Sequence, residues 1–296
     1  MAIQVRQLHP LFVGEVSGVD LRHPTDEATQ AEIQAAIDRH AVLVFHDQAI
    51  DDEQQIAFAE RFGPLERSTL RTLRQGPSRL GHEALVDVSN LDEYGRPFAP
   101  GERRQLFSLG NRMWHTDSSF KRVPGKYSLL HALAIPPRGG ETEFTDLRAG
   151  YDTLPEETKT QLQGLVVEHS LVYSHGAIGF TDFSDEERAA LPPVPQLLVR
   201  VLPGSGRKTL YLASHASHVI GWPVPEGRVL LRELIESATQ REFVHQHQWR
   251  AGDLVMWDNR CTMHRVRPYD QTTERRDVRR VTVADVAPTL EPRLAS

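Results

Sequence analysis

Short strand-like segments, separated by turn residues and not by regular helices, are the feature that most restricts the fold of this chain. Runs of β-branched, aromatic and aliphatic residues recur along the sequence, and Gly, Pro, Asp and Asn stand between them. These runs occupy residues 41–45, 85–89, 127–134, 166–173, 197–201, 209–213, 243–249, 254–257 and 280–284. Strands that follow one another without intervening helices argue against a doubly wound parallel sheet and favour a sandwich or a barrel. We therefore expect a mainly β fold with flanking helices.

Helical patterns are few and lie mostly near the N-terminus. Asp51, followed by Gln54 three positions later, is typical of a capped helix start, and Gly63 with Pro64 is typical of its end. The same reasoning predicts four helices, which cover residues 26–40, residues 51–63, a stretch from about residue 155, and residues 226–239. Residues 93–104 and 176–195 are expected to be long loops, where active-site lids are often found.

Composition excludes several classes of protein. A length of 296 residues suits one large domain or two small ones, and the formal net charge of −6 provides no basic field for nucleic acid. The single cysteine, Cys261, excludes a disulfide framework within the chain. The first residues lack a signal-peptide layout, and no apolar run approaches the ~20 residues that span a bilayer. We expect a cytoplasmic protein that binds neither nucleic acid nor membrane.

One histidine and one aspartate stand at a spacing that suits metal binding. On a strand, residues i and i+2 point to the same side, so His115 and Asp117 could offer a nitrogen and an oxygen to one ion. The best partner is His264, which follows the apolar run 254–257 and a turn-forming Asp-Asn pair. Two histidines and one carboxylate form the facial triad that suits iron(II) with open coordination positions.

A basic stretch follows this histidine. Arg276 lies 12 residues after His264, and Arg280 lies four residues further on, so the two would share one face of a strand. A guanidinium can hold a carboxylate through two parallel hydrogen bonds, which would provide one cation for a dicarboxylate co-substrate and one for a substrate. The alternative is that these arginines, together with Arg275 and Arg279, form a solvated surface run.

Two other histidine pairs compete for the metal. His245 and His247 also stand two positions apart, but no acidic residue follows them at short range, and they look like one semi-buried strand face. His215 and His218 lack a carboxylate at ligand spacing and suit polar wall or surface positions better.

Taken together, these motifs resemble the taurine dioxygenase family of Fe(II)/2-oxoglutarate-dependent dioxygenases, and most closely its 2,4-dichlorophenoxyacetate dioxygenase branch. The resemblance extends from Leu11 to about Val286, so a single domain over residues 1–296 is expected. It implies a double-stranded β-helix, or jelly roll. The segments that carry it are His115-x-Asp117, Gly139-Gly140-Glu141-Thr142, Trp257-Asp258-Asn259-Arg260 with His264, and the pair Arg276 and Arg280.

The resemblance also implies roles for individual residues. Iron(II) would be bound by His115, Asp117 and His264, and the distal carboxylate of 2-oxoglutarate by Thr142 and Arg276. The substrate would be contacted by Arg280, Asn111 and Arg71, with Arg74 as an alternative to Arg71. Expected partners are O2 and a small anionic substrate, with ascorbate as an activator in vitro and a homo-oligomer as the assembly.

The resemblance implies hydroxylation of an aryloxyacetate at the carbon next to the ether oxygen, giving a phenol and glyoxylate together with succinate and CO2. The same chemistry on a sulfonate, an alkyl sulfate or a natural aromatic carboxylate is an alternative, because Arg280 could bind any of these anions. A third possibility is a non-catalytic jelly-roll binding module. Candidate walls for an aromatic ring are Phe107, Phe120, Tyr173 and Phe180.

Overall fold

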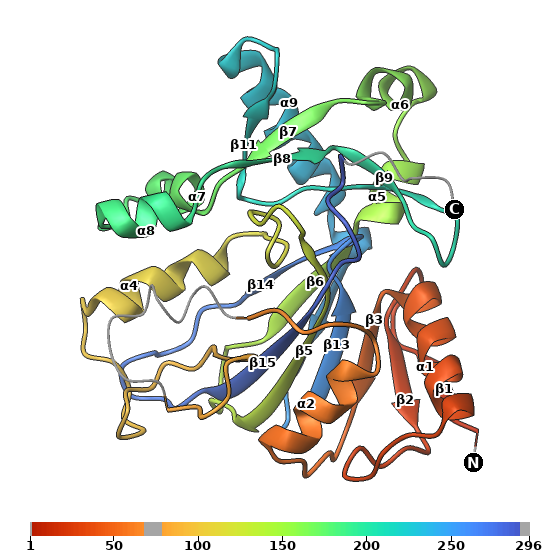
Figure 1. Cartoon of the computed structure of the whole chain (residues 1–296), viewed down its shortest axis with the longest axis vertical. Helices are drawn as coiled ribbons and strands as arrows, with labels where there is room; N and C mark the ends of the chain where they lie inside the picture. Colours follow the sequence, from red (N-terminus) through yellow and green to blue (C-terminus); the bar gives the residue numbers. More distant parts are fainter. Residues whose placement is uncertain (1, 68–78, 291–296) are drawn as a thin grey trace.

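A computed structural model describes residues 2–67 and 79–290, and its largest element is a seven-stranded sheet (Figure 1). Its strands lie in the order β1-β2-β3-β13-β5-β15-β4, and they pair in antiparallel fashion except for β2 and β3. The bounds are β1 Gln4–Gln7, β2 Gly14–Ser17, β3 Val42–Phe45, β4 Leu85–Asp87, β5 Gly125–Ala134, β13 Leu254–Asp258 and β15 Asp277–Ala284. The predicted mainly β architecture is confirmed.

Smaller sheets complete the strand framework. A three-stranded sheet in the order β12-β6-β14 faces the large one, and it is built from β6 Thr142–Asp146, β12 Val244–His247 and β14 Thr262–Val266. A second three-stranded sheet consists of β7 Val166–His169, β8 Val194–Leu197 and β11 Ala216–Val219, and a two-stranded one of β9 Val199–Val201 and β10 Lys208–Leu210.

Helices flank the sheets, and two of the expected helix starts have the predicted caps. The Asp26 side chain accepts from the backbone of Thr29, and Asp51 forms a reciprocal capping box with Gln54. The α-helices are α1 Glu27–His40, α2 Asp52–Glu60, α4 Arg103–Ser108, α5 Leu147–Asp152, α6 Glu156–Leu162, α7 Leu171–Ala177, α8 Asp185–Ala190 and α9 Val224–Ala238. Two 3-10 helices, η1 Leu109–Arg112 and η2 Arg241–Phe243, are also present.

Several local predictions were wrong. The expected loop 176–195 contains α8 and the start of β8, and α4 begins at the end of the expected loop 93–104. The strand predicted over residues 166–173 stops at His169, because the Ser170 side chain caps α7 there. Strands β1, β2, β6, β11 and β14 were not expected from the sequence.

The large sheet separates two apolar layers. On one face, Leu43, Phe45, Leu129 and Met256 pack with residues of α1 and α2. On the other face, Val42, Val44, Leu130, Val255 and Trp257 pack with Phe144 of β6 and with Trp249. This second layer lies between the large sheet and the β12-β6-β14 sheet, and it forms the floor of the pocket described below.

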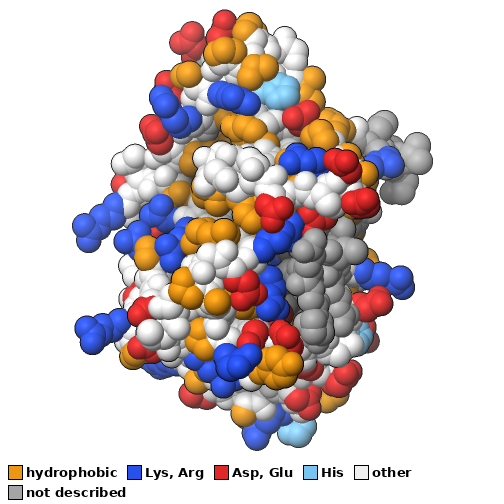
Figure 2. Space-filling model, turned by 90° about the vertical axis from the view of Figure 1, so that its left-hand side faces the viewer, with side chains coloured by type: hydrophobic (Ala, Val, Ile, Leu, Met, Phe, Trp, Pro, Cys, Tyr) orange, Lys and Arg blue, Asp and Glu red, His pale blue; other side chains and the backbone are white. Residues whose placement is uncertain are grey.

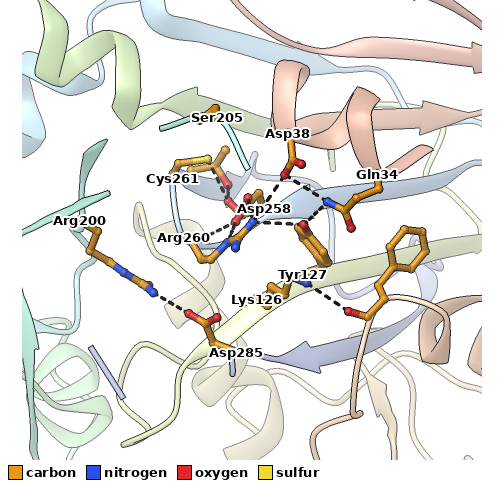
Figure 3. Close-up of polar contacts among 12 residues, drawn as sticks. Gln34, Asp38, Lys126, Tyr127, Arg200, Ser205, Asp258, Arg260, Cys261 and Asp285 are labelled. Atoms are coloured by element: carbon orange, nitrogen blue, oxygen red, sulfur yellow. Dashed lines mark hydrogen bonds and ion pairs between the residues drawn. The ribbon is translucent and has the colours of Figure 1, made fainter. Parts of the chain in front are cut away.

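A buried polar network holds the turn that joins β13 to β14 (Figure 3). The Arg260 guanidinium donates to both oxygens of Asp258 and to the Tyr127 hydroxyl, which also accepts from Gln34 of α1. Buried charges of this kind are retained when they are paired and hydrogen-bonded. Because Asn259 lies between Asp258 and Arg260, the network fixes a residue that contacts the site.

No helix in the described ranges is long and apolar enough to cross a membrane. On the face shown in Figure 2, basic and acidic side chains are interspersed and not segregated by sign.

Candidate metal centre

His115 and Asp117 lie between η1 and β5, and not on a regular strand as their spacing suggested. The backbone turns at Ser118, whose φ is 57°, directly after Asp117. His115 is joined to β14 by a reciprocal pair of backbone hydrogen bonds with His264, with N···O distances of 3.0 and 2.8 Å. This bridge, and not strand periodicity, brings the two histidines together.

The ligand atoms of His115, Asp117 and His264 all lie within 4.8 Å of one another. In the described part of the chain, no other group of three or more His, Cys, Asp or Glu side chains is arranged so that it could hold a metal ion. His115 Nε2 lies 3.8 Å from Asp117 Oδ1, and His264 Nε2 lies 3.7 Å from Asp117 Oδ2. Ligand atoms about 2.1 Å from a shared ion lie at most about 4.2 Å apart, so one ion could bridge these pairs. His115 Nδ1 donates to the Met113 carbonyl at 2.8 Å, which leaves Nε2 as the metal-facing lone pair.

The protonation states suit metal binding. Burial lowers the pKa of both His115 and His264, so each imidazole is neutral at pH 7. Burial alone would raise the pKa of Asp117, but Arg280 and the two histidines hold that pKa below its usual range. The centre therefore presents two neutral nitrogens and one carboxylate, which is the donor set of a non-haem iron(II) site.

Asp117 is fixed by contacts from three strands or turns. Ser128 of β5 donates to Asp117 Oδ2 at 2.7 Å, and Asn259 Oδ1 accepts from the Asp117 backbone at 3.2 Å. Asn259 Nδ2 also donates to Ser128 Oγ at 2.9 Å, which closes a small hydrogen-bonded ring. Arg280 of β15 donates from Nη1 to Asp117 Oδ1. The aspartate is thus oriented before any ion binds.

A pocket opens beside the centre. It is lined by the two histidines and by the predicted ligand-binding residues Asn111, Thr142, Arg276 and Arg280. The remaining lining residues include Val88, Ser89, Asn90, Leu130, Trp257, Tyr269 and Gln271. Residues from β5, β6, β13, β14 and β15 therefore meet in one space between the two facing sheets.

Arg276 is the cation of this pocket that lacks an acidic partner. It is 4% exposed, and among the described residues no carboxylate pairs with its guanidinium, whose Nε has no hydrogen-bond partner. A guanidinium stays protonated in proteins, so a buried one requires an anion. Arg276 therefore requires an anionic partner such as a carboxylate in the pocket, which Thr142 also lines.

Comparison with known proteins shows the family of the chain. The family model described as "Taurine catabolism dioxygenase TauD, TfdA family" matches residues 4–282. The chain belongs to the TauD/TfdA dioxygenase family.

Relatives in this family match along almost the whole chain. Alpha-ketoglutarate-dependent 2,4-dichlorophenoxyacetate dioxygenase of Burkholderia sp. (strain RASC) is 46% identical and covers 99% of this chain and 98% of its own length. The protein of that name from Cupriavidus pinatubonensis is 47% identical over 97% of this chain and 99% of its own length. A crystal structure of AAD-2 with Mn(II) and N-oxalylglycine is 53% identical, has a TM-score of 0.94, and covers 98% of this chain and 100% of its own. The predicted jelly-roll fold agrees with this structural match.

The other histidine pairs of this TauD/TfdA dioxygenase have structural partners. His247 Nε2 lies 3.1 Å from Asp253 Oδ2, six residues further along the chain, and neither His245 nor His247 belongs to a metal-ligand group among the described residues. His245 packs against His9, and burial is the main cause that lowers its pKa to about 4. His215 lies nearer the centre, with its ring 6.2 Å from that of His115.

Some sequence-based expectations fall elsewhere. Arg71 and Arg74 lie outside the described residues, so their predicted contact remains a prediction. Phe107, Phe120 and Phe180 pack in one apolar cluster with Leu171, while Tyr173 lies under Arg228.

Sequence reasoning missed Asn90, which anchors the segment that carries the arginine of the pocket. Its Oδ1 accepts from the backbone of Arg276, and its Nδ2 donates to the carbonyls of Gln271 and Glu274. No motif singles out this asparagine, because its partners lie about 180 residues away in the chain.

Proposed function

We propose that this chain is an Fe(II)- and 2-oxoglutarate-dependent dioxygenase that acts on an aryloxyacetate such as 2,4-dichlorophenoxyacetate. The observation that carries the proposal is the buried guanidinium of Arg276, which has no carboxylate partner among the described residues and lines the same pocket as His115 and His264. A dicarboxylate that chelates a metal at one end would place its other carboxylate on such a cation. The two relatives that are 46% and 47% identical, both named as 2,4-dichlorophenoxyacetate dioxygenases, support the substrate class.

The proposal assigns metal, co-substrate and substrate binding to different residues of the site. His115, Asp117 and His264 would hold iron(II), and Arg276 with Thr142 would hold the distal carboxylate of 2-oxoglutarate. Arg280 and Asn111 would bind the carboxylate of the substrate and turn its methylene carbon toward the metal, with Arg71 as a further contact. The bound iron supplies the activation of O2, which is coupled to decarboxylation of 2-oxoglutarate.

The proposed reaction balances without another co-reactant. One O2 and one 2-oxoglutarate give succinate, CO2 and a hydroxyl group on the carbon next to the ether oxygen. The resulting hemiacetal releases a phenol and glyoxylate when the bond between that carbon and the ether oxygen breaks. The protein's contribution is to fix the substrate pose, since a misplaced methylene would not react. A homo-oligomeric assembly and a cytoplasmic location are part of the same proposal.

The test is aerobic turnover with iron(II), ascorbate, 2-oxoglutarate and 2,4-dichlorophenoxyacetate, with succinate and free phenol measured together. One phenol per succinate supports the proposal. Succinate without phenol would keep the iron chemistry and direct the search to sulfonates, alkyl sulfates or natural aromatic carboxylates. Neither product, from protein shown to contain iron, would favour the non-catalytic binding module.

A further inference from the structure

Trp249, in the segment after β12, contacts the side chain of Thr142 through its indole ring. Trp249 is 8% exposed and belongs to the apolar layer between the two facing sheets. Its Nε1 donates a hydrogen bond to Thr142 Oγ1 at 2.9 Å. Thr142 is the first residue of β6 and lines the pocket beside the metal centre, whereas Trp249 does not line it.

This hydrogen bond determines what the threonine hydroxyl can do. A hydroxyl has one proton to donate and two lone pairs that accept, and an indole N–H can only donate. Trp249 therefore occupies a lone pair and leaves the Thr142 proton uncommitted. Within the described ranges, Thr142 Oγ1 has no other hydrogen-bond partner. The proton is free for donation to an acceptor bound in the pocket that Thr142 and Arg276 both line.

The indole ring of Trp249 is in turn packed against His247. The His247 ring meets the ring of Trp249 edge-on, with centroids 4.6 Å apart and an interplanar angle of 87°. His247 Nε2 contacts the buried carboxylate of Asp253, and His247 is also the strand partner of Thr142 between β12 and β6. A line of contacts thus runs from Asp253 through His247 and Trp249 to the threonine hydroxyl.

We propose that Trp249 is a positioning residue for 2-oxoglutarate. It fixes the rotamer of Thr142 and orients the hydroxyl proton toward the distal carboxylate, without touching the co-substrate itself. This inference rests on the proposed function, because it takes Thr142 and Arg276 to be the residues that hold that carboxylate. Its distinctive consequence is that Trp249 acts only through the oxygen of Thr142.

The test is a double-mutant cycle on the Mn(II)-loaded protein, with the affinity for 2-oxoglutarate measured as a dissociation constant by titration calorimetry. Thr142→Val removes the hydroxyl and keeps the shape, so this constant should rise about tenfold or more, as for a lost hydrogen bond to a charged group. Trp249→Phe should raise it about 3- to 10-fold. The double variant should bind no more weakly than Thr142→Val alone, because coupled residues are not additive. Trp222→Phe, in the separate apolar cluster that includes Leu231 of α9, is the matched control and should leave the constant unchanged.

The outcomes separate this inference from the proposed function. If the wild-type protein does not bind 2-oxoglutarate, the proposed function fails, and the inference fails with it. If Thr142→Val weakens binding while Trp249→Phe does not, only the inference is overturned. A double variant whose loss equals the product of the two single losses also overturns it, because Trp249 would then act through packing.

A spectroscopic measurement covers the case in which Trp249→Phe does not fold. Indole N–H resonances can be recorded on the Zn(II)-loaded protein with labelled tryptophan. In Thr142→Val, one of the four indole signals should move upfield and exchange faster with water, because its acceptor is gone. All four signals unchanged in that variant would overturn the inference.

Discussion

Arg280 and Asp117 form a buried ion pair in which the guanidinium Nη1 donates to Asp117 Oδ1, on the same carboxylate that faces both histidines of the triad. The arginine proposed to bind the substrate therefore already contacts a carboxylate that is proposed to bind the metal. A substrate anion on Arg280 would lie directly beside the metal centre, because the strand β15 places the guanidinium there. Under the proposed function, substrate recognition and metal binding would be linked through the side chain of Arg280.

Replacing Arg280 by alanine should raise the Michaelis constant for the substrate by about 10- to 100-fold, and more than it raises the constant for the co-substrate. Arg279→Ala is the matched control, since Arg279 is its neighbour on β15 but pairs with Asp52 of α2. Steady-state kinetics with each ligand varied in turn measure both constants. A larger effect on the co-substrate would mean that the roles of Arg276 and Arg280 are exchanged.

Alanine in place of His115, Asp117 or His264 should abolish turnover and metal binding. The two histidine variants should stay folded, because the contact between their segments is made by backbone atoms. Asp117→Ala should lower the stability as well, because it leaves the buried guanidinium of Arg280 without its carboxylate partner. Metal content after dialysis, activity and thermal melting are the three measurements. His245→Ala should keep both metal and activity. Normal activity in any of the triad variants would remove that residue from the metal centre.

Ser128→Ala should weaken metal binding about tenfold, as is usual when a partner of a metal ligand is lost. The serine hydroxyl donates to Asp117 Oδ2, so its loss frees that carboxylate to rotate. The metal dissociation constant, measured by competition with a chelator, gives the effect. Ser217, a buried serine bonded to Glu168, provides the control as Ser217→Ala. Equal metal affinities in both variants would show that Ser128 does not orient Asp117.

Asn90→Ala should raise the Michaelis constant for the co-substrate more than that for the substrate, because it releases the turn that precedes Arg276. Asn90→Asp keeps the acceptor for the Arg276 backbone and removes the two donated bonds, so its effect should be intermediate. Kinetics of both variants against both ligands make the comparison. An unchanged constant for the co-substrate in Asn90→Ala would contradict the anchoring role.

His169 should make the fold sensitive to acid. Burial lowers its pKa to about 3, below the value near 6.5 that an unfolded histidine has. As the pH falls below about 6.5 the unfolded state binds a proton first, so the free energy of unfolding should decrease until about pH 3. One such group contributes a slope of about 1.4 kcal/mol per pH unit.

His169→Gln should flatten this dependence, whereas the exposed His23→Gln should not. Urea unfolding at several pH values between 7 and 4 measures the slope for each protein. If His169→Gln and the wild type showed the same slope, protonation of His169 would not contribute to acid unfolding.

The sequence allowed the general fold and the central residues of the site to be predicted, but not the strands that carry the site. Strands β6 and β14 were missed because they contain Thr142, His264 and other polar residues, which break the apolar alternation that identifies strands. Short helices such as α8 were missed because isolated helices of that length depend on tertiary packing.

Sequence motifs could not identify the residues that orient the site residues, for a different reason. Ser128, Trp249 and Asn90 act on residues that are 11, 107 and 186 positions away in the chain. Their roles exist only after the sheets have formed. Spacing could identify His115, Asp117 and His264 as candidates, but it placed the first two on a strand that does not exist.

The backbone bridge between His115 and His264 has a consequence for how this scaffold can diversify. Because main-chain atoms hold these two segments together, the loss of one histidine side chain would leave the other segment in place. A single substitution at His115 or His264 would then open a coordination position and keep the contact between the two segments. New reactivity at this centre could arise by removing a ligand, in a protein that is already folded and already able to bind its co-substrate.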